Sequence, residues 1–450
     1  MRARVPTLRR EGAAMRQQAA EPAVVPATPA PAHPAPAPRT RAGDGAPRPP
    51  HPAEGPRGAS PPDPVADPDR DVASAVEAVL DDYLTRRRED AARTSDRFAA
   101  DIADCLIDLV RRGGKRLRPA FLWWGWRTAG GRPGDGEAEA VLHAAAALEL
   151  VQACALVHDD LMDDSPSRRG APAAHVALAD LHRAGGLRGD PAVFGASAAL
   201  LTGDLALVWA EDLWDEASPS PEARRRTRPV WRAMRTEMVA GQYLDLHGQA
   251  SGAPSPSSSL RVAHLKSGLY TVERPLHLGA ALADAGPRVT AALRRAGRSA
   301  GTAFQLRDDL LDVFGDPART GKPAGEDVRR GKSTYLMAVG LRLARGRGRE
   351  RRAARELLDR ALGDPVLGHG EVERVRAVLT ELGARAAVER HIAELAQDAL
   401  AALEELGQPA GPNLPAGSED APVRRLASLV RAVLGDTPDA LAAPVTAPVR

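Results

Sequence analysis

The chain has 450 residues, 43% of them hydrophobic, and is long enough to build one large core or two ordinary ones. Its 61 Lys and Arg residues nearly balance its 59 Asp and Glu residues, which argues against nucleic acid or an anionic membrane surface as a partner. The only two cysteines, Cys105 and Cys154, lie in apolar helical patterns. This usage argues against a disulfide scaffold and favours a reducing compartment, so we expect a cytoplasmic protein.

The two ends of the chain differ in composition from its middle. Residues 1–70 are rich in Pro, Ala and Gly and carry almost no large apolar side chains, which predicts a disordered tail. Residues 437–450 are expected to form a second disordered tail, and residues 71–436 a single domain. We find no stretch that approaches the roughly 20 apolar residues of a membrane span, and the N-terminus lacks the apolar region of a signal peptide. The sequence therefore predicts no membrane span.

Helical periodicity dominates the middle of the chain. Apolar residues recur at three- and four-residue spacing, most clearly in residues 72–84, 140–162, 290–314 and 371–406, and these segments are rich in Ala, Leu, Glu and Arg. Alternating strand-like runs do not compete with them, and an aromatic content of 3% is low for a β-protein. The pattern predicts an all-α bundle of roughly ten or more helices.

Two acidic triads each end an apolar helical segment. In both, the carboxylates stand at i, i+1 and i+4, so they project from one face of the helix. Such a like-charge cluster persists only where cations fill it or water surrounds it. One copy could be a solvated turn, but two copies in matching apolar contexts favour a site for Mg²⁺, which prefers oxygen ligands. The triads are Asp159, Asp160, Asp163 and Asp308, Asp309, Asp312.

Basic and polar residues accompany both triads. Any one of them alone is most simply a solvated charge, but their placement beside the triads predicts binding of a ligand that carries phosphate groups. Two precede the triads in the segment GGKRLRP, two follow the first triad, two lie in HLKSGLY, and two bracket the loop after the second triad. They are Lys115, Arg118, Arg168, Arg169, Lys266, Ser267, Lys322 and Lys332.

These motifs, in this order, resemble those of the polyprenyl synthetase family of trans-prenyl diphosphate synthases, and among these the bacterial geranylgeranyl diphosphate synthases. The similarity covers residues 72–434 and rests on GGKRLRP, HDDLMDDSPSRRG, KSG, GQYLDL, FQLRDDLLD and GKPAGEDVRRGK. It implies an all-α isoprenoid synthase fold around a central cavity, usually in a homodimer. It also implies three Mg²⁺ ions between the two Asp-rich motifs, and isopentenyl diphosphate and an allylic diphosphate as substrates.

The resemblance also implies roles for single residues. The six triad aspartates would act as metal ligands and, with Lys266, as the catalytic group; Asp159, Asp163 and Asp308 would be the direct ligands. Two residues depart from the common pattern: Gln152 stands where many members have His, and Ser267 replaces the commoner Thr. Residues similar to those that hold the allylic diphosphate are Arg168, Lys266, Ser267, Gln305, Lys322 and Lys332. Residues similar to those that hold isopentenyl diphosphate are Lys115, Arg118, Gln152 and Arg169.

The length of the product depends on the depth of the cavity. The growing chain would run along the helix that carries the first triad, and one isoprene unit is close in length to a helical turn of about 5.4 Å. Cys154 and Ala155, both small, lie one to two turns upstream, where farnesyl diphosphate synthases often place an aromatic ring, so we expect a geranylgeranyl product. Val151 and the tryptophans at 123, 124 and 126 either form a deeper floor or are core residues.

Other functions are compatible with parts of this pattern. A farnesyl or a longer-chain polyprenyl diphosphate synthase is the main alternative. A terpene cyclase shares the fold but typically lacks a second DDxxD motif and GGKRLRP. A non-catalytic subunit of a heteromeric prenyl synthase usually loses triad aspartates, whereas both triads are intact here.

Overall fold

The computed structural model describes residues 67–133, 136–217, 220–252, 254–317, 323–407 and 420–435. All of them belong to one unit, residues 62–450. The two predicted disordered tails lie outside the described residues, apart from residues 67–70 at the start of the domain.

Helices make up nearly all the regular structure, so the predicted all-α class is confirmed for the described residues. A two-residue antiparallel pair, β1 (Ser167–Arg168) and β2 (Ala171–Pro172), follows the first triad. Two segments, η1 (Ala99–Ala103) and η2 (Ala263–Glu273), are π-helical. The α-helices are α1 (Val72–Thr94), α2 (Asp96–Phe98), α3 (Asp104–Arg111), α4 (Leu117–Thr128), α5 (Glu137–Met162), α6 (Ala174–Ala184), α7 (Pro191–Glu216), α8 (Pro221–Ser251), α9 (Pro256–Val262), α10 (Arg274–Leu282), α11 (Pro287–Phe314), α13 (Glu326–Arg329), α14 (Tyr335–Leu343), α15 (Arg349–Ala361), α16 (His369–Glu381), α17 (Ala384–Gly407) and α18 (Asp420–Leu434).

Local sequence signals set where the long helices begin. The side chain of Asp190 accepts a hydrogen bond from the amide of Ala192 at the start of α7, and Ser220 caps α8 in the same way. Both caps are followed by a proline, at residues 191 and 221, whose fixed φ suits the first helical position. These caps explain why the chain breaks between α6, α7 and α8 rather than continuing as one helix.

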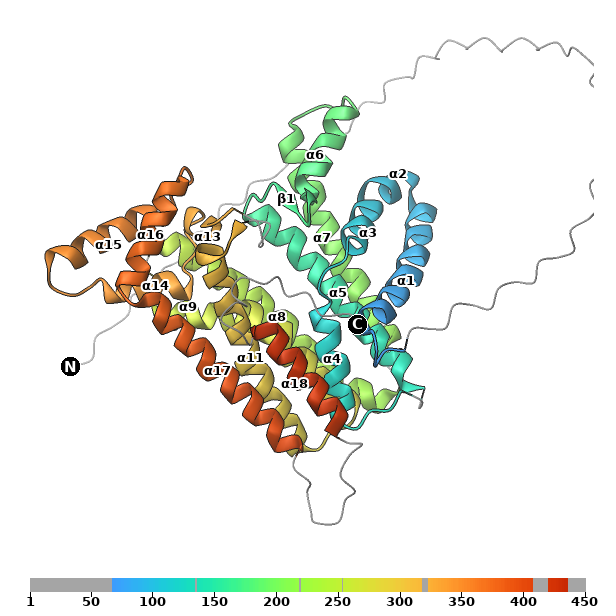
Figure 1. Ribbon diagram of the computed structural model, residues 1–450. Coiled ribbons are helices and arrows are strands. Elements are labelled where there is room, and N and C mark those ends of the chain that lie inside the picture. Colours follow the sequence, from blue (N-terminus) through green and yellow to red (C-terminus); the bar gives the residue numbers. More distant parts are fainter. Residues whose placement is uncertain are drawn as a thin grey trace, which may run out of the picture. The chain divides into compact units, whose positions relative to one another are not determined.

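Two pairs of long helices carry the interior. Helix α5 packs along α7, and α11 packs along α17 and against η2, as Figure 1 shows. A run of small residues, Ala144 to Ala147 in α5, is completely buried and lets neighbouring helices approach closely. The first triad ends α5 and the second ends α11, so each is attached to a rigid, well-packed helix.

The prediction that no stretch is long and apolar enough to span a membrane is wrong for two helices. Helices α5 and α7 are each 26 residues long, with 18-residue windows of mean hydropathy 1.8 and 1.6. In α5, 72% of that window is buried inside the protein, as in a core helix, whereas in α7 only 39% is buried. One or two such helices are weak evidence for a membrane span, because core helices pass the same test. Helix α7 therefore has an apolar side that the other described residues leave exposed.

Candidate active site

The first triad lies at the C-terminal end of α5. A carboxylate there is repelled by the negative end of the helix dipole, so it needs cationic partners. Asp160 is buried, and Arg168 donates from Nε to both of its carboxylate oxygens at 3.0 Å. Asp163, the C-cap of α5, accepts from Lys332 Nζ at 2.9 Å and lies 3.4 Å from Arg330 Nη1. Asp160 is thus neutralised by Arg168 of the following β1–β2 hairpin, and Asp163 by Lys332, which is distant in the sequence.

Asp159 is held by the π-helical segment η2. Lys266 Nζ lies 3.1 Å from Asp159 Oδ1 and 2.8 Å from Asp245 Oδ2 on α8. Burial alone would raise the pKa of Asp159, but Lys266, Lys332 and Arg168 outweigh it and hold that pKa below its usual value. Burial likewise opposes the charge of Lys266, yet Asp245 and Asp159 raise its pKa, so the ammonium group stays charged.

A close contact between backbones sets the position of Lys266. Helix α8 approaches η2 at Gly241, where an added Cβ would lie 2.4 Å from the backbone nitrogen of Lys266. Only glycine permits this spacing. Ser267 follows Lys266 on the same segment, as the sequence predicts. π-Helical segments occur frequently at functional sites, because they offset side chains relative to a regular helix.

Among the residues that the structure describes, Asp309 and Asp312 of the second triad make no hydrogen bond or ion pair with Lys or Arg, unlike the carboxylates of the first triad. Asp309 is buried, and burial together with the charge of Asp327 raises its pKa to about 8, while Gln305 donates to it at 2.8 Å. The pKa of Asp312 is raised by burial and by Asp327 as well, although the backbone amide of Asp327 donates to its Oδ2 at 3.1 Å. Buried Asp309 and half-buried Asp312 and Asp327 repel one another, and such a group of carboxylates favours a bound cation.

Contacts connect the two triads. Lys332 contacts Asp163 of the first triad at 2.9 Å and Asp327 at 3.4 Å, and Asp327 in turn binds Asp312 of the second triad. The charges of Asp327, Asp163 and Asp159 overcome burial and raise the pKa of Lys332. Two motifs about 150 residues apart in the chain therefore belong to one site, as the sequence predicts. Lys322 lies outside the described residues.

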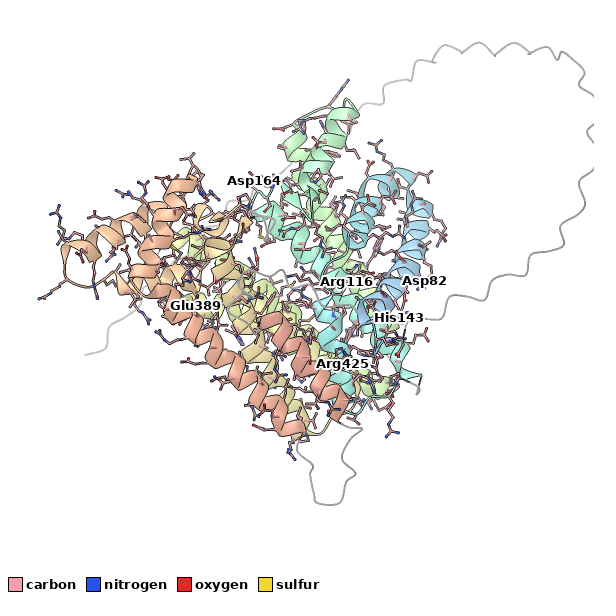
Figure 2. All side chains as sticks on the ribbon, viewed as in Figure 1. Asp82, Arg116, His143, Asp164, Glu389 and Arg425 are labelled. Atoms are coloured by element: carbon pink, nitrogen blue, oxygen red, sulfur yellow. The ribbon has the colours of Figure 1, made fainter. Side chains whose placement is uncertain are left out.

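The predicted isopentenyl diphosphate residues gather beside α4 and α5. Arg116, labelled in Figure 2, has a left-handed backbone, with φ of 45°. Its buried side chain lies 2.6 Å from Glu149 on α5, and this ion pair anchors the GGKRLRP turn. Lys115, the residue before it, stays exposed. Arg169, also left-handed with φ of 53°, donates to the carbonyl of Leu109 at 3.0 Å. An added Cβ on Gly114 would lie 2.8 Å from Arg169 Nη2, so the Arg169 side chain would have to shift to admit it.

Arg118 and Gln152 meet at a residue that the sequence did not single out. Tyr270 of η2 donates from its hydroxyl to Gln152 Oε1 at 2.8 Å, and the Arg118 guanidinium lies 4.0 Å from the centroid of its ring. Arg118 also donates to Thr271 Oγ1 at 3.0 Å. The two predicted ligands from α4 and α5 are therefore held by one segment, η2.

Sequence reasoning missed further residues that the structure brings into this site. They lie within segments that had been recognised, HLKSGLY, GQYLDL and GKPAGEDVRRGK, but only Lys266, Ser267, Lys322 and Lys332 had been assigned there. Gln242 donates to Asp159 Oδ1 at 3.2 Å, in addition to the contacts described above. The missed residues are Gln242, Asp245, Asp327, Arg330 and Tyr270.

The donor set fits Mg²⁺. Among the residues that the structure describes, no three His, Cys, Asp or Glu side chains are already gathered as a metal-binding cluster. In the first triad each carboxylate is instead paired with Lys or Arg. The available ligands are carboxylate oxygens, which suit Mg²⁺ and not a metal that prefers nitrogen or sulfur.

Cys154 and Ala155, the residues expected to limit product length, lie on α5, the helix that packs along α7. Cys154 is buried, its Sγ lies 3.7 Å from His158 Nδ1, and burial raises the pKa of the thiol to about 12. His158 in turn contacts the carbonyl of Leu200 on α7. Trp123 and Trp126 are fully buried in the same apolar cluster as Val151, which matches their interpretation as core residues.

Comparisons with known proteins agree with this geometry. A model of the polyprenyl synthetase family matches residues 100–375. The chain is 39% identical to a geranylgeranyl pyrophosphate synthase from Corynebacterium glutamicum, solved with isoprenyl diphosphate and magnesium; the match covers 82% of this chain and 100% of that one, with a TM-score of 0.73. It is 32% identical to a nonaprenyl diphosphate synthase from Mycobacterium tuberculosis over 75% of this chain and 90% of the relative. A farnesyl diphosphate synthase from Escherichia coli (strain K12) is 33% identical over 57% of this chain and 82% of that one.

Proposed function

Because the chain belongs to the polyprenyl synthetase family and is a trans-prenyl diphosphate synthase with the isoprenoid synthase fold, we propose that its product is geranylgeranyl diphosphate. The substrates would be isopentenyl diphosphate and an allylic diphosphate. The observation that supports prenyl transfer is the joining of two carboxylate triads through Lys332 and Asp327, beside the half-buried, charged Lys266.

Three Mg²⁺ ions are proposed for the site. Asp159, Asp163 and Asp308 would be direct ligands, with Asp160, Asp309 and Asp312 as further ligands or hydrogen-bond partners of bound water. Bound Mg²⁺ neutralises the charge of the departing diphosphate, which otherwise makes it a poor leaving group. The raised pKa values of Asp309 and Asp312 support this assignment, since a cation relieves their mutual repulsion.

The basic side chains would hold the allylic diphosphate. Arg168, Lys266 and Lys332 now neutralise the first triad, and they become available to phosphate oxygens when those carboxylates take up cations. Ser267 follows Lys266 on η2, and Gln305 donates to Asp309 of the second triad. With Lys322 they complete the proposed set. As the C–O bond of the allylic substrate breaks, these positive charges stabilise the diphosphate that leaves.

The carbon–carbon bond forms at the other substrate. Lys115, Arg118, Gln152 and Arg169 would hold isopentenyl diphosphate so that its double bond faces the allylic cation. Its electron pair forms the new bond to that cation, and a proton is then lost from the adjacent carbon, with the departing diphosphate as acceptor. The apolar residues of α5 exclude water, which would otherwise capture the cation.

Product length rests on the small side chains at Cys154 and Ala155. The relatives named above make products of fifteen, twenty and more carbons, so membership of the family leaves the length open. Small residues one to two turns before the triad remove the barrier that would end growth at fifteen carbons. Farnesyl and longer polyprenyl diphosphates are the alternatives.

A product assay tests this proposal. The purified chain would be incubated with Mg²⁺, isopentenyl diphosphate and farnesyl diphosphate, and the dephosphorylated product measured by mass spectrometry. A twenty-carbon alcohol is expected. Extension of dimethylallyl and geranyl diphosphate but not of farnesyl diphosphate would contradict the proposed floor, and longer alcohols would favour the polyprenyl alternative. No turnover with any allylic substrate would favour a non-catalytic subunit.

We also propose that the protein acts in the cytoplasm as a homodimer. Helices α7 and α8 expose a set of large apolar side chains, which soluble monomers rarely gather on neighbouring helices. A second copy of the chain would cover this set, called here the α7/α8 face. Its members are Val193, Leu200, Leu201, Val208, Val239 and Tyr243, each at least 49% exposed.

A further inference from the structure

Tyr270 occupies the junction of three elements at the proposed isopentenyl diphosphate site. It lies on η2, four residues after Lys266, and its side chain is only 3% exposed. Its hydroxyl reaches Gln152 on α5, and its ring lies under Arg118 of α4. Neither contact is local in sequence, since Tyr270 and Gln152 are 118 residues apart.

The Arg118 side chain is held by two contacts, but not all of its N–H groups have a hydrogen-bond acceptor. The ring of Tyr270 attracts the guanidinium through a cation–π interaction, and Thr271 accepts from Nη2. Arg118 Nε is buried and has no hydrogen-bond partner among the described residues. A buried N–H group without an acceptor is costly, so the guanidinium is held in this place by the Tyr270 ring and by Thr271, and not by a contact at Nε.

The Gln152 amide is oriented by the same residue. An amide has one accepting oxygen and one donating NH₂ group, and the Tyr270 hydroxyl donates to the oxygen. The NH₂ group is therefore left to donate, which is the property that an anionic ligand requires. Gln152 stands where many family members have His. A free amide could present either its oxygen or its NH₂ group to the ligand, and the hydrogen bond from the Tyr270 hydroxyl fixes which one it presents.

We infer that Tyr270 is a positioning residue for isopentenyl diphosphate, which it serves by holding the Arg118 guanidinium and the Gln152 amide in the orientations that receive the diphosphate group. This inference rests on the proposed function. Tyr270 does not touch the reacting carbons, so it affects the Michaelis constant (KM) for isopentenyl diphosphate and not the chemistry at the allylic centre.

Two substitutions test the inference. Tyr270→Phe removes the hydrogen bond and keeps the ring, and we expect it to raise the KM for isopentenyl diphosphate about 3- to 10-fold. Tyr270→Leu also removes the cation–π contact and is expected to add a further ~2- to 5-fold. The KM for the allylic diphosphate should stay within twofold of the parent value for Tyr270→Phe. Steady-state kinetics with each substrate varied in turn would measure both constants, and thermal melting would be recorded alongside.

A matched control is available at Tyr83. Its hydroxyl is buried and donates to the carbonyl of Trp209 at 2.8 Å, far from Arg118 in the sequence and on other elements, so Tyr83→Phe removes a comparable hydrogen bond. We expect it to lower the melting temperature without changing the KM for isopentenyl diphosphate. An unchanged KM in Tyr270→Phe, or an equal rise in both KM values, would overturn the inference. Failure of the parent protein to form any prenyl product would instead overturn the proposed function.

Discussion

Asp309 is a residue at which stability and activity are expected to oppose each other. Burial and the nearby Asp327 raise its pKa from 3.8 to about 8. A carboxyl whose pKa is higher in the folded than in the unfolded protein stabilises the fold at low pH, and this contribution is lost as the pH rises through about 8. Asp309→Asn should therefore melt at the same or a higher temperature than the parent at pH 8 without Mg²⁺. Its turnover with Mg²⁺ should fall at least ~100-fold.

A surface aspartate provides the control for this substitution. Asp398 on α17 is exposed, so Asp398→Asn should change neither the melting temperature nor the turnover. Calorimetry at pH 8 and a steady-state assay would measure both quantities. If Asp309→Asn melted well below the parent in the absence of Mg²⁺, the carboxylate would be stabilising the fold, contrary to its raised pKa.

The residues that the sequence predicted lie in compact local patterns, whereas the missed residues act through partners distant in the sequence. The six aspartates and their neighbouring arginines form compact local patterns, so composition and spacing were enough to find them. Gln242 and Tyr270 are single residues whose partners, Asp159 and Gln152, lie 83 and 118 residues away. Both residues lie within recognised motifs, but their partners depend on how the helices pack, which no local pattern records.

At the level of the elements, the contact between α8 and η2 determines where Lys266 lies. An alanine at Gly241 would place its Cβ 2.4 Å from the Lys266 nitrogen, so one of the two backbones has to move. We expect Gly241→Ala to destabilise the protein by ~1–3 kcal/mol and to lower kcat, because Lys266 shifts away from Asp159 and Asp245. Urea denaturation and steady-state kinetics would measure the two effects.

The same helix contains a control glycine. At Gly248 the nearest atom to an added Cβ is Ser333 Oγ at 3.7 Å, an ordinary contact. Gly248→Ala should leave activity unchanged and, because alanine favours helix more than glycine, stabilise the protein by up to ~1 kcal/mol. Equal effects of the two substitutions would mean that helix propensity, and not the contact with η2, governs both.

Helical periodicity predicted that the elements are helices, but it did not predict the π-helical form of η2 or the length of the apolar helices α5 and α7. Three- and four-residue spacing identified the segments that became α1, α5 and α11, whereas the segment predicted over residues 371–406 is divided at Gly383 into α16 and α17. The π-helical η2 has almost the same local pattern as an α-helix, and its form depends on tight packing against α8 and α11. The prediction that no stretch was long and apolar enough to span a membrane was wrong for α5 and α7. Alanine-rich core helices acquire that composition because small side chains allow close packing.

At the scale of the whole molecule, the uneven burial of α7 has a specific consequence. Helix α7 packs on α5 with one side, and its other side carries most of the α7/α8 face. If a second copy covers this face, the species in solution has twice the chain mass of 47.5 kDa. A charge placed in such an interface is buried without a partner, which is strongly unfavourable.

Leu201→Glu tests the dimer because Leu201 is 57% exposed in the single chain, so the substitution costs the isolated fold little. Sedimentation velocity should give a dimer for the parent and a monomer for Leu201→Glu at micromolar concentration. Val366→Glu is the matched control, because Val366 is 83% exposed, belongs to the loop between α15 and α16 and lies outside the α7/α8 face, so this variant should remain dimeric. A dimer that survives Leu201→Glu, or a parent that is monomeric, would show that the face has another role. If the dimer is lost while the melting temperature is retained, the apolar side of α7 exists to bind a second copy, since the fold of one chain does not need it.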